Sequence, residues 1–569
     1  MKQNIFIGGA WPYANGLLHV GHLAALLPGD VIARYYRKCG ANVLYVSGTD
    51  SHGTPITTRA RKENCKPIEI VEHYHTDFCY CFNKLQFSYD NYTLTCNPYH
   101  KNFVQDCIKT IYNNGYIYEK DGHLCWKLSS FQKEIEAFVS SHKNTWRFNA
   151  INESHKYLQA GLRDRDITRQ LDWGIDIPIE GYTDKKVYVW IEAVLGYISA
   201  GKNYCEQHGL DWNEFYKGTN VKSYFVHGKD NIPFHTIIYP ALLLSLNDGY
   251  HLPDYMISSE YLNVNDKKIS KSQANGVTAR ELIDKYSSDT IRYCMIAQAP
   301  EQKDSNFNYE LVTQLHNKKL VGEYGNFVNR NLAFLTKKFN GVIPNGTVDE
   351  HVKTCIMKTY NAVGTLITNG ELKTAMTRIQ DLVQFANKYY DDNKPWISVK
   401  NDIASFNNIT LTCLELIVNI ANLYEPFIPE SSKKVFSFFD KTNCIELQIP
   451  KKNTKQEKKE SGHTMTSTVL PPLRAFFTTT CLSMRSLSAA TWEMMPTRRS
   501  PSVRPARTRM ACSRLSSSSE PKPSSRKRVS SRMPPAALWT SSERPRASAS
   551  EALKLSPPER VLTLRRVPL

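Results

Sequence analysis

Cysteine pairs at metal-binding spacing are missing from this 569-residue chain. Its 14 cysteines include no Cys-x-x-Cys, and the closest pair is Cys79-x-Cys81. Neither a structural zinc knuckle nor the paired framework of a small secreted domain is visible, so we expect no metal site. The sequence also lacks a charged-then-apolar leader and an uninterrupted apolar run of 18 residues. We therefore expect a cytoplasmic protein with reduced thiols and no membrane partner.

Seven residue types are missing from Met465–Leu569, which contains no Ile, Asn, Asp, Tyr, Gly, Gln or His. This segment has 19 Lys and Arg against 5 Glu, a net charge of +14 out of +18 for the whole chain, which leaves +4 for residues 1–464. Such a composition cannot bury enough apolar surface to fold independently. We interpret 451–569 as a charged linker with a disordered or out-of-frame tail. The alternative is a basic tail that contacts an RNA backbone.

Residues 5–54 carry the clearest local pattern. Two apolar runs and a periodic apolar segment predict a strand at 5–7, a helix at 23–36 and a strand at 43–46. In such a parallel crossover, ligands bind beyond the carboxyl ends of the strands. His19, Gly21 and His22 lie where the turn becomes the helix, whose first N–H groups attract phosphate. The imidazoles add donors, and Gly21 lets a flat ring approach the backbone; two surface histidines are the alternative interpretation.

A second phosphate-binding pattern follows about 250 residues later. Lys268, Ser270 and Lys271 lie in a Gly/Asn/Ser-rich loop after an apolar segment. Two lysines three residues apart on a polar loop can neutralise the charge that develops when pyrophosphate leaves a triphosphate. A solvated loop is the plain alternative for this motif alone. Together and in this order, the two motifs resemble the signature pair of class I aminoacyl-tRNA synthetases.

The rest of the chain predicts an α/β protein with a helical second half. We expect helices at 57–64, 67–83 and 99–118, an irregular insertion at 123–162, strand–helix patterns at 185–199 and 223–244, and a helix at 278–300. Successive helices with short loops over 308–440 predict a bundle. His73, His75 and His100 are expected on helix surfaces or partly packed. The predicted parts are 1–115 and 223–307 (two halves of a catalytic domain), 116–222 (insertion), 308–450 (bundle) and 451–569 (linker and tail).

Five stretches, the lysine loop among them, extend the resemblance to one family. They are Ala10-Trp11-Pro12-Tyr13-Ala14-Asn15-Gly16, Gly48-Thr49-Asp50-Ser51-His52-Gly53, Gly228-Lys229-Asp230, Lys268-Ile269-Ser270-Lys271-Ser272 and Lys394-Pro395-Trp396. With them the chain resembles methionyl-tRNA synthetase over about residues 3–450. The resemblance implies a Rossmann-like parallel-sheet catalytic domain split by an insertion, followed by an α-helical anticodon-binding bundle. It also implies that methionine and ATP with Mg²⁺ give methionyl-adenylate, whose methionyl group then passes to tRNA.

The resemblance also implies roles for individual residues. The catalytic and ATP-binding residues would be His19, Gly21, His22, Lys268, Ser270 and Lys271. The methionine-binding residues would be Ala10, Trp11, Tyr13, Asp50, Trp190, Ala193, Tyr197 and His235, with Asp50 taking the ammonium group. The anticodon contacts would be Asn326, Arg330 and Trp396, which can bond base edges or stack on a base. Glu192 stands where the family often has Asp.

The chain departs from the family at its zinc knuckle. Asp121-Gly122-His123 joins two stretches that cysteine-bearing knuckles commonly separate, and Cys125 is the only cysteine between Cys107 and Cys205. Structural zinc is therefore not expected. Because the knuckle lies over the path of the tRNA acceptor end in the family, we expect aminoacylation to suffer more than adenylate formation.

Three other interpretations use the same motifs. A leucyl, isoleucyl or valyl synthetase needs a large editing insertion, because one methylene contributes only about 1–3 kcal/mol of discrimination. The stretch between the half-sheets is too short for one. A tRNA-binding or degenerate synthetase-like protein with impaired charging would bind tRNA without methionine-dependent pyrophosphate exchange. A small-molecule nucleotidyltransferase would not explain the helical second half, and the sequence leaves the oligomeric state open.

Overall fold

The computed structural model describes residues 2–264 and 276–439. The chain divides into two units, Met1–Arg499 and Ser500–Leu569, and every described residue belongs to the first. Lys268, Ser270 and Lys271 lie outside the described residues, and so does the expected linker and tail 451–569. The other site residues expected from the sequence lie within them.

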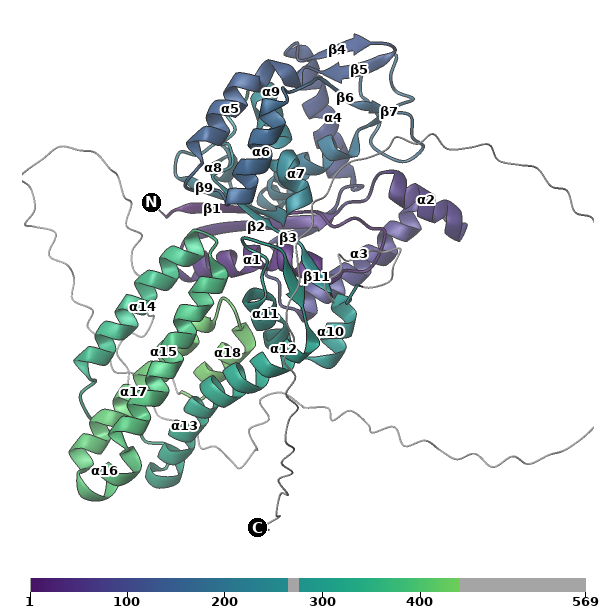
Figure 1. Ribbon diagram of the computed structural model, residues 1–569. Helices are drawn as coiled ribbons and strands as arrows, with labels where there is room; N and C mark the ends of the chain where they lie inside the picture. The colour runs from purple at the N-terminus through teal and green to yellow at the C-terminus, as the bar shows by residue number, and fades with distance from the viewer. Residues whose placement is uncertain (1, 265–275, 440–569) are drawn as a thin grey trace, which may run out of the picture. The chain divides into compact units, whose positions relative to one another are not determined.

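Five parallel strands form the central sheet in the order β10-β9-β1-β2-β3 (Figure 1). Their bounds are β1 Asn4–Gly9, β2 Asn42–Thr49, β3 Asn91–Leu94, β9 Val221–Gly228 and β10 Tyr255–Ser259. In the central strand, Ile5 pairs with Val43 of β2 on one side and with Lys222 of β9 on the other. Three strands precede the insertion and two follow it, which confirms the predicted split parallel sheet. β3 was not predicted, because its four half-buried residues form no apolar run.

Alternate side chains of β1 enter two hydrophobic cores on opposite faces of the sheet. Ile5 and Ile7 join one core and Phe6 joins the other, as the period of two in a strand requires. The helices of the first core include α1 Val20–Lys38, α3 Pro67–Lys84, α10 Ala279–Lys285 and α11 Ser288–Ala297. Those of the second include α4 Pro98–Asn113, α7 Val189–Gln207 and α9 Tyr239–Leu246. Both faces are covered, as in other parallel sheets.

The predicted helices between the strands are present with small changes. The segments at 57–64, 67–83 and 99–118 correspond to α2 Thr54–Glu63, α3 and α4. The pattern at 278–300 is two helices rather than one. The break falls at Ser287, whose hydroxyl accepts the backbone N–H of Thr290 and thereby starts α11.

The insertion begins with a tight hairpin of β4 Ile117–Lys120 and β5 His123–Trp126. Asp121 (φ 52°) and Gly122 (φ 73°) form its two-residue turn, where left-handed backbone suits Asp-Gly. The remaining elements are η1 Leu128–Phe131, α5 Gln132–Ser141, α6 Phe148–Gln159, β6 Arg165–Asp166, β7 Thr168–Arg169, β8 Lys186–Val187 and α8 Asn213–Tyr216. The prediction of an irregular stretch at 123–162 is wrong, because α5 and α6 pack on each other and bury Ile135, Val139 and Ile151.

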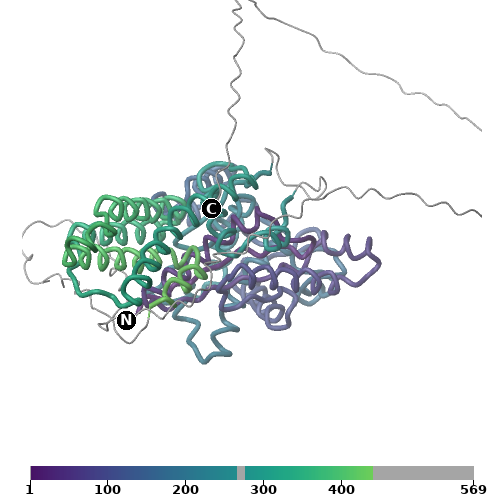
Figure 2. The backbone as a smooth tube through the Cα atoms, turned by 90° about the horizontal axis from the view of Figure 1, so that it is seen from below, coloured from purple at the N-terminus to yellow at the C-terminus, as the bar shows by residue number. Residues whose placement is uncertain are grey.

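The second half is a helical bundle, as predicted. Strands β9 and β10 are connected through η2 Lys229–Asn231, the π-helical segment η3 Phe234–Ile238 and α9, and the parallel pair β11 Leu262–Val264 and β12 Ser305–Phe307 follows β10. The bundle contains α12 Tyr309–Leu315, η4 His316–Gly325, α13 Asn326–Phe339, α14 Glu350–Thr368, α15 Leu372–Asn393, α16 Pro395–Asn401, α17 Ile403–Tyr424 and α18 Pro429–Ser437. Helices α14, α15 and α17 lie side by side in both views (Figure 2).

Helix α17 is apolar enough to need an explanation. Among residues 2–264 and 276–439 it is the one helix whose length and hydropathy would allow it to cross a membrane. However, 67% of its apolar window is buried within the protein, and Cys413, Leu416, Ile417 and Ile420 belong to the hydrophobic core. Its apolar character is therefore that of the central helix of a bundle.

Candidate active site

The two histidines of the first motif begin helix α1. His19 is the N-cap, and its Nδ1 accepts the backbone N–H of Gly21 at 3.2 Å. Nδ1 of His22 accepts the backbone N–H of His19 at 3.1 Å, and the two rings lie 3.8 Å apart. Because both Nδ1 atoms act as acceptors, the ring hydrogen of each neutral imidazole is on Nε2. The helix N-terminus thus carries two imidazoles whose remaining nitrogens are donors, which suits an anionic ligand.

The chain that leaves the lysine loop returns to this same place. Val20 donates its backbone N–H to Val277 at 3.0 Å, and Ala279 donates to Leu18 at 2.8 Å. Thr278, between them, forms a β-bridge with His19. Val277–Ala279 are therefore hydrogen-bonded beside the histidines, while Lys268 and Lys271 lie outside the described residues.

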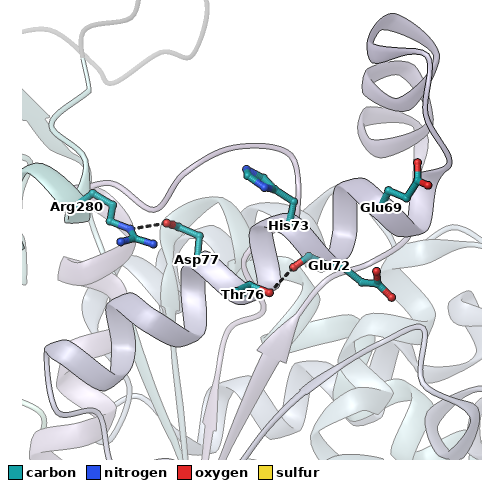
Figure 3. A pocket seen from close by; sticks show the side chains of 6 residues that line it. All are labelled: Glu69, Glu72, His73, Thr76, Asp77 and Arg280. Atoms are coloured by element: carbon teal, nitrogen blue, oxygen red, sulfur yellow. Dashed lines mark hydrogen bonds and ion pairs between the residues drawn. The ribbon is translucent and has the colours of Figure 1, made fainter.

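Arg280 anchors this segment to helix α3. Its Nε lies 2.6 Å from the Asp77 carboxylate, and its guanidinium stacks 3.7 Å from the centre of the Tyr80 ring. Arg280 and Asp77 line a surface groove between α3 and α10, together with Glu69, Glu72, His73 and Thr76 (Figure 3). His73 is exposed there, in keeping with the predicted helix surface. The groove is distinct from the residues expected to bind methionine, none of which lines it.

Asp50 and Tyr13 lie side by side beyond the carboxyl ends of β2 and β1. Asp50 donates its backbone N–H to Pro12 at 2.9 Å and accepts that of Ala14 at 3.0 Å, which forms an isolated parallel bridge between Tyr13 and Asp50. Asp50 is 2% exposed. Burial and then the neighbouring Glu192 raise the pKa of Asp50 well above its usual range. A cationic group beside Asp50 would reverse this effect, so the site is suited to an ammonium ion.

Trp11 fills a gap that two glycines leave open. A Cβ atom at Gly48 of β2 would lie 1.8 Å from the Trp11 ring, and one at Gly196 of α7 would lie 2.7 Å from it. The indole is therefore wedged between the sheet and α7, with Tyr197 at 6.2 Å between ring centres. Ala10, the residue before it, is buried. The glycines are needed here for close approach rather than for backbone freedom.

Helix α7 and segment η3 bring the other expected side chains together. Trp190 stacks on Phe234 at 4.0 Å and meets Tyr13 edge-on at 5.9 Å. Tyr197 lies one turn after the buried Ala193 on α7, and its hydroxyl is 2.7 Å from His235 Nε2. All eight residues expected to bind methionine therefore lie just after β1 and β2 or on α7 and η3.

The hydrogen bonds of His235 define its tautomer and protonation state. Its Nδ1 lies 2.8 Å from the carbonyl oxygen of Asn231, which can only accept, so Nδ1 carries the ring hydrogen. Nε2 is then an acceptor, and the Tyr197 hydroxyl donates to it. Burial lowers the pKa of His235 to about 4, which agrees with a neutral ring. His235, which lies where the methionine side chain is expected to bind, is therefore uncharged.

The sequence did not indicate several residues of this region. Phe234 stacks on Trp190, and His227 stacks on His235 at 4.2 Å between ring centres. His52 and His100 both approach Glu192, and all three are buried. His52 belongs to one of the family motifs. His100 was expected on a helix surface or partly packed, and at 2% exposure it is fully buried. Glu192 and His227 carry a sequence signal, since each is an ionisable side chain in or at the end of an apolar run, whereas His52 and His100 lie in polar stretches.

The residues expected to contact an anticodon lie together on the bundle. Arg330 stacks 4.1 Å from the centre of the Tyr390 ring, and Trp396 lies against the same ring at 5.6 Å. The Arg330 fork also pairs with Asp391 at 2.8 Å, while Trp396 is 42% exposed. Asn326 begins α13 one turn before Arg330 and is exposed. An exposed ring beside a held guanidinium is suited to an unpaired base.

No group of three or more His, Cys, Asp or Glu side chains is placed to hold a metal ion in the part of the chain that the structure describes. Cys125, the cysteine nearest the missing knuckle, is buried and its thiol donates to Asp166 at 2.9 Å. The eleven described cysteines are all free of disulfide bonds.

Comparisons with known proteins match both the sheet-containing half and the helical half of the chain. The sequence matches the family of tRNA synthetases class I (M) over residues 5–122 and 119–332, and the anticodon binding domain of methionyl tRNA ligase over 343–469. Methionine–tRNA ligase 1 of Alkaliphilus oremlandii is 43% identical, over 76% of this chain and 92% of that protein. The chain belongs to the methionyl-tRNA synthetase family. Methionine–tRNA ligase of Bacillus anthracis is 41% identical, over 76% of this chain and 91% of its own length.

A solved methionyl-tRNA synthetase has the same fold. The Mycobacterium tuberculosis enzyme in complex with methionyl-adenylate superposes with a TM-score of 0.70, over 77% of this chain and 94% of that chain, at 23% identity. The resemblance inferred from the motifs and the predicted fold class are both confirmed. Membership in the methionyl-tRNA synthetases also disfavours the leucyl, isoleucyl and valyl alternatives.

Proposed function

We propose that this chain joins methionine to tRNA in two steps, through methionyl-adenylate. In the first, a carboxylate oxygen of methionine attacks the α-phosphorus of ATP, a new O–P bond forms, and the bond to pyrophosphate breaks. In the second, a hydroxyl of the terminal ribose of tRNA attacks the methionyl carbonyl carbon, and AMP leaves. ATP enters as its magnesium complex. The names of the relatives and the adenylate in the solved structure of similar fold support this proposal.

The residues act by positioning and by charge stabilisation, since no covalent protein intermediate is needed. His19 and His22 donate from Nε2 to the phosphates, while Lys268 and Lys271 neutralise the charge that develops on pyrophosphate. Asp50 accepts the ammonium group of methionine. The observation that carries the proposal is the pairing of Leu18–Val20 with Val277–Ala279, six residues after Lys271 in the chain.

The side-chain half of the site suits a thioether. Trp190 and Tyr197, with the neutral His235 behind them, form an uncharged aromatic wall beside Ala193. A polarisable sulfur gains from contact with aromatic rings, and its flexible chain adapts to an irregular wall. The bundle residues Asn326, Arg330 and Trp396 contact the anticodon in this proposal, and the enzyme works in the cytoplasm.

Amino-acid-dependent exchange of labelled pyrophosphate into ATP tests the first step. We expect exchange with methionine and none above background with leucine, isoleucine or valine. Binding of tRNA without exchange for any amino acid would instead identify a degenerate synthetase-like protein. Charging of tRNA with labelled methionine tests the second step.

The short β4–β5 hairpin predicts an unequal activity in the two steps. Compared with a knuckle-bearing homologue, kcat/KM for tRNA charging should be lower by about 10²-fold, because small misplacement of a reacting end has effects of that size. The value for pyrophosphate exchange should be similar in the two enzymes, because Asp121 and Gly122 lie in the insertion and not among the residues that contact ATP. Equal losses in both reactions would refute this partition.

Trp396 should affect only the reaction that uses tRNA. Replacing it by alanine removes a stacking surface, which contributes about 1–3 kcal/mol per base. We expect the KM for tRNA of Trp396→Ala to rise by about 10-fold to 100-fold, with pyrophosphate exchange unchanged. Trp396→Phe should recover most of the loss, because a flat ring remains beside Tyr390. A KM for tRNA equal to that of the unmodified enzyme would remove Trp396 from the anticodon site.

A further inference from the structure

Three buried ionisable side chains meet next to Asp50, each from a different element. His52 follows β2, His100 lies in the first turn of α4, and Glu192 lies in the first turn of α7. His52 Nδ1 is 2.8 Å and 3.0 Å from the two carboxylate oxygens of Glu192. His100 Nε2 is 3.7 Å from the second oxygen. The side chains are 1%, 2% and 0% exposed for His52, His100 and Glu192, so these contacts are shielded from water.

The hydrogen bonds around His100 determine which of its atoms faces the carboxylate. The Ser199 hydroxyl donates to Nδ1 of His100 at 2.7 Å, a shorter contact than its 3.2 Å to the Gly196 carbonyl, so the ring hydrogen of His100 is on Nε2. His100 therefore presents Nε2 to Glu192. Burial by itself raises the pKa of Glu192, but His52 and His100 lower it below its usual value. Glu192 is an ionised carboxylate that hydrogen-bonds His52 and faces Nε2 of His100 at 3.7 Å.

Helix α7 uses two adjacent faces for two purposes. Trp190, Ala193 and Tyr197, spaced by three and four residues, lie on the face that meets the side-chain end of the site. Glu192, Gly196 and Ser199, with the same spacing, lie on the face that meets His52, Trp11 and His100. The helix that supplies the aromatic wall is thus fastened to the loop that carries Asp50.

His52 also contacts Asp50 itself. The backbone N–H of His52 donates to the Asp50 carboxylate at 3.3 Å, while the ring of the same residue bonds Glu192. His52 therefore connects the proposed ammonium acceptor with α7, although the two segments are 140 residues apart. An amino acid that binds at both ends needs these two segments at a constant separation.

We propose that Glu192 is a positioning residue for methionine, which sets the separation between Asp50 and the aromatic wall of α7 through His52 and His100. This inference rests on the proposed function, because it assumes that methionine binds between Asp50 and α7. Glu192 has no contact with the phosphate-binding histidines among the hydrogen bonds and ion pairs of the described residues, so its effect falls on the amino acid and not on ATP. Glu192 acts on methionine only indirectly, through the positions of His52 and His100.

The test compares Glu192→Ala with Glu192→Gln, using calorimetry for methionine binding and pyrophosphate exchange for both KM values. Glu192→Ala should raise the Kd and the KM for methionine by about 10-fold to 100-fold, since a buried hydrogen bond to a charged group is lost. The KM for ATP should stay within about twofold. Glu192→Gln should recover most of the affinity, because its amide oxygen still accepts the His52 N–H.

A matched histidine–carboxylate pair elsewhere in the same domain provides the control. Asp254 accepts His251 Nε2 at 2.7 Å and the Ser223 hydroxyl at 3.1 Å, away from the proposed site. Asp254→Ala should lower the thermal midpoint and leave the KM for methionine unchanged. That comparison separates a loss of stability from a loss of positioning.

Two results would overturn the inference. One is a Glu192→Ala variant whose affinity for methionine equals that of the unmodified protein, and the other is a parallel rise of both KM values in Glu192→Ala and Glu192→Gln. Failure of the proposed function has a different signature. An unmodified chain that binds methionine in the calorimeter but shows no exchange would refute the enzymatic proposal, while the Kd values would still decide the role of Glu192.

Discussion

Replacing His19 by asparagine should lower kcat/KM for methionine-dependent pyrophosphate exchange by about 10²-fold to 10³-fold, the usual effect of removing one donor from a site of developing negative charge. Asparagine is as good an N-cap as any residue, so the start of α1 and the protein's stability should be kept. What is lost is the Nε2–H of the imidazole, whose Nδ1 is already used by the backbone N–H of Gly21. Initial rates of exchange, with ATP varied, provide the measurement.

The control replaces another N-cap by asparagine. Asp349 caps α14 by accepting the backbone N–H groups of His351 and Val352, far along the chain from His19. Asp349→Asn should change neither the exchange rate nor the thermal midpoint by a measurable amount. A His19→Asn variant with exchange within threefold of the unmodified enzyme, about 0.6 kcal/mol, would show that the imidazole does not act on ATP.

Replacing Arg292 by alanine should lower the free energy of unfolding by about 3–5 kcal/mol, because it leaves a buried carboxylate without its main partner. Arg292 on α11 is 1% exposed and lies 2.7 Å from Asp30, which is 0% exposed and in the middle of α1. The guanidinium also donates to the carbonyl groups of Leu85, Pro426 and Phe427 at 2.9–3.1 Å. Urea unfolding followed by circular dichroism measures the difference.

The pH dependence of this loss has a defined sign. Burial opposes ionisation of Asp30, but Arg292 and Arg34 lower its pKa below the usual value. A carboxylate with a lowered pKa contributes stability above its unfolded-state pKa and loses it as the pH falls through the folded-state pKa. The difference between the unmodified protein and Arg292→Ala should therefore shrink on acidification from neutral pH.

An exposed ion pair serves as the control for Arg292. Arg378 and Asp381 lie 3.5 Å apart on α15 with more than half of each side chain exposed. Arg378→Ala should cost less than about 1 kcal/mol, as exposed pairs do. If Arg292→Ala proved no more destabilising than Arg378→Ala, the buried pair would not hold α1 against α11 as we infer.

The sequence alone was sufficient for the parts of the protein whose cause is local. The helix predicted at 23–36 follows from an apolar period of 3.6, and α1 Val20–Lys38 contains that range. The split parallel sheet follows from β-branched runs that alternate with helices, and the bundle follows from helix after helix with short loops. The family motifs are also short, local patterns. They predicted the eight residues that lie together just after β1 and β2 and on α7 and η3.

Only the tertiary structure decided the features that join distant segments. In the sequence, Glu192 is only a small departure from a family motif. The structure shows that His52 and His100, from two other segments, lie against its carboxylate. The helices α5 and α6, predicted as irregular, are stable because they bury apolar faces on each other, a gain that no local window contains. Local propensity and capping are properties of neighbouring residues, whereas the burial and charge of a side chain depend on what folds against it, and the chain order does not reveal those partners.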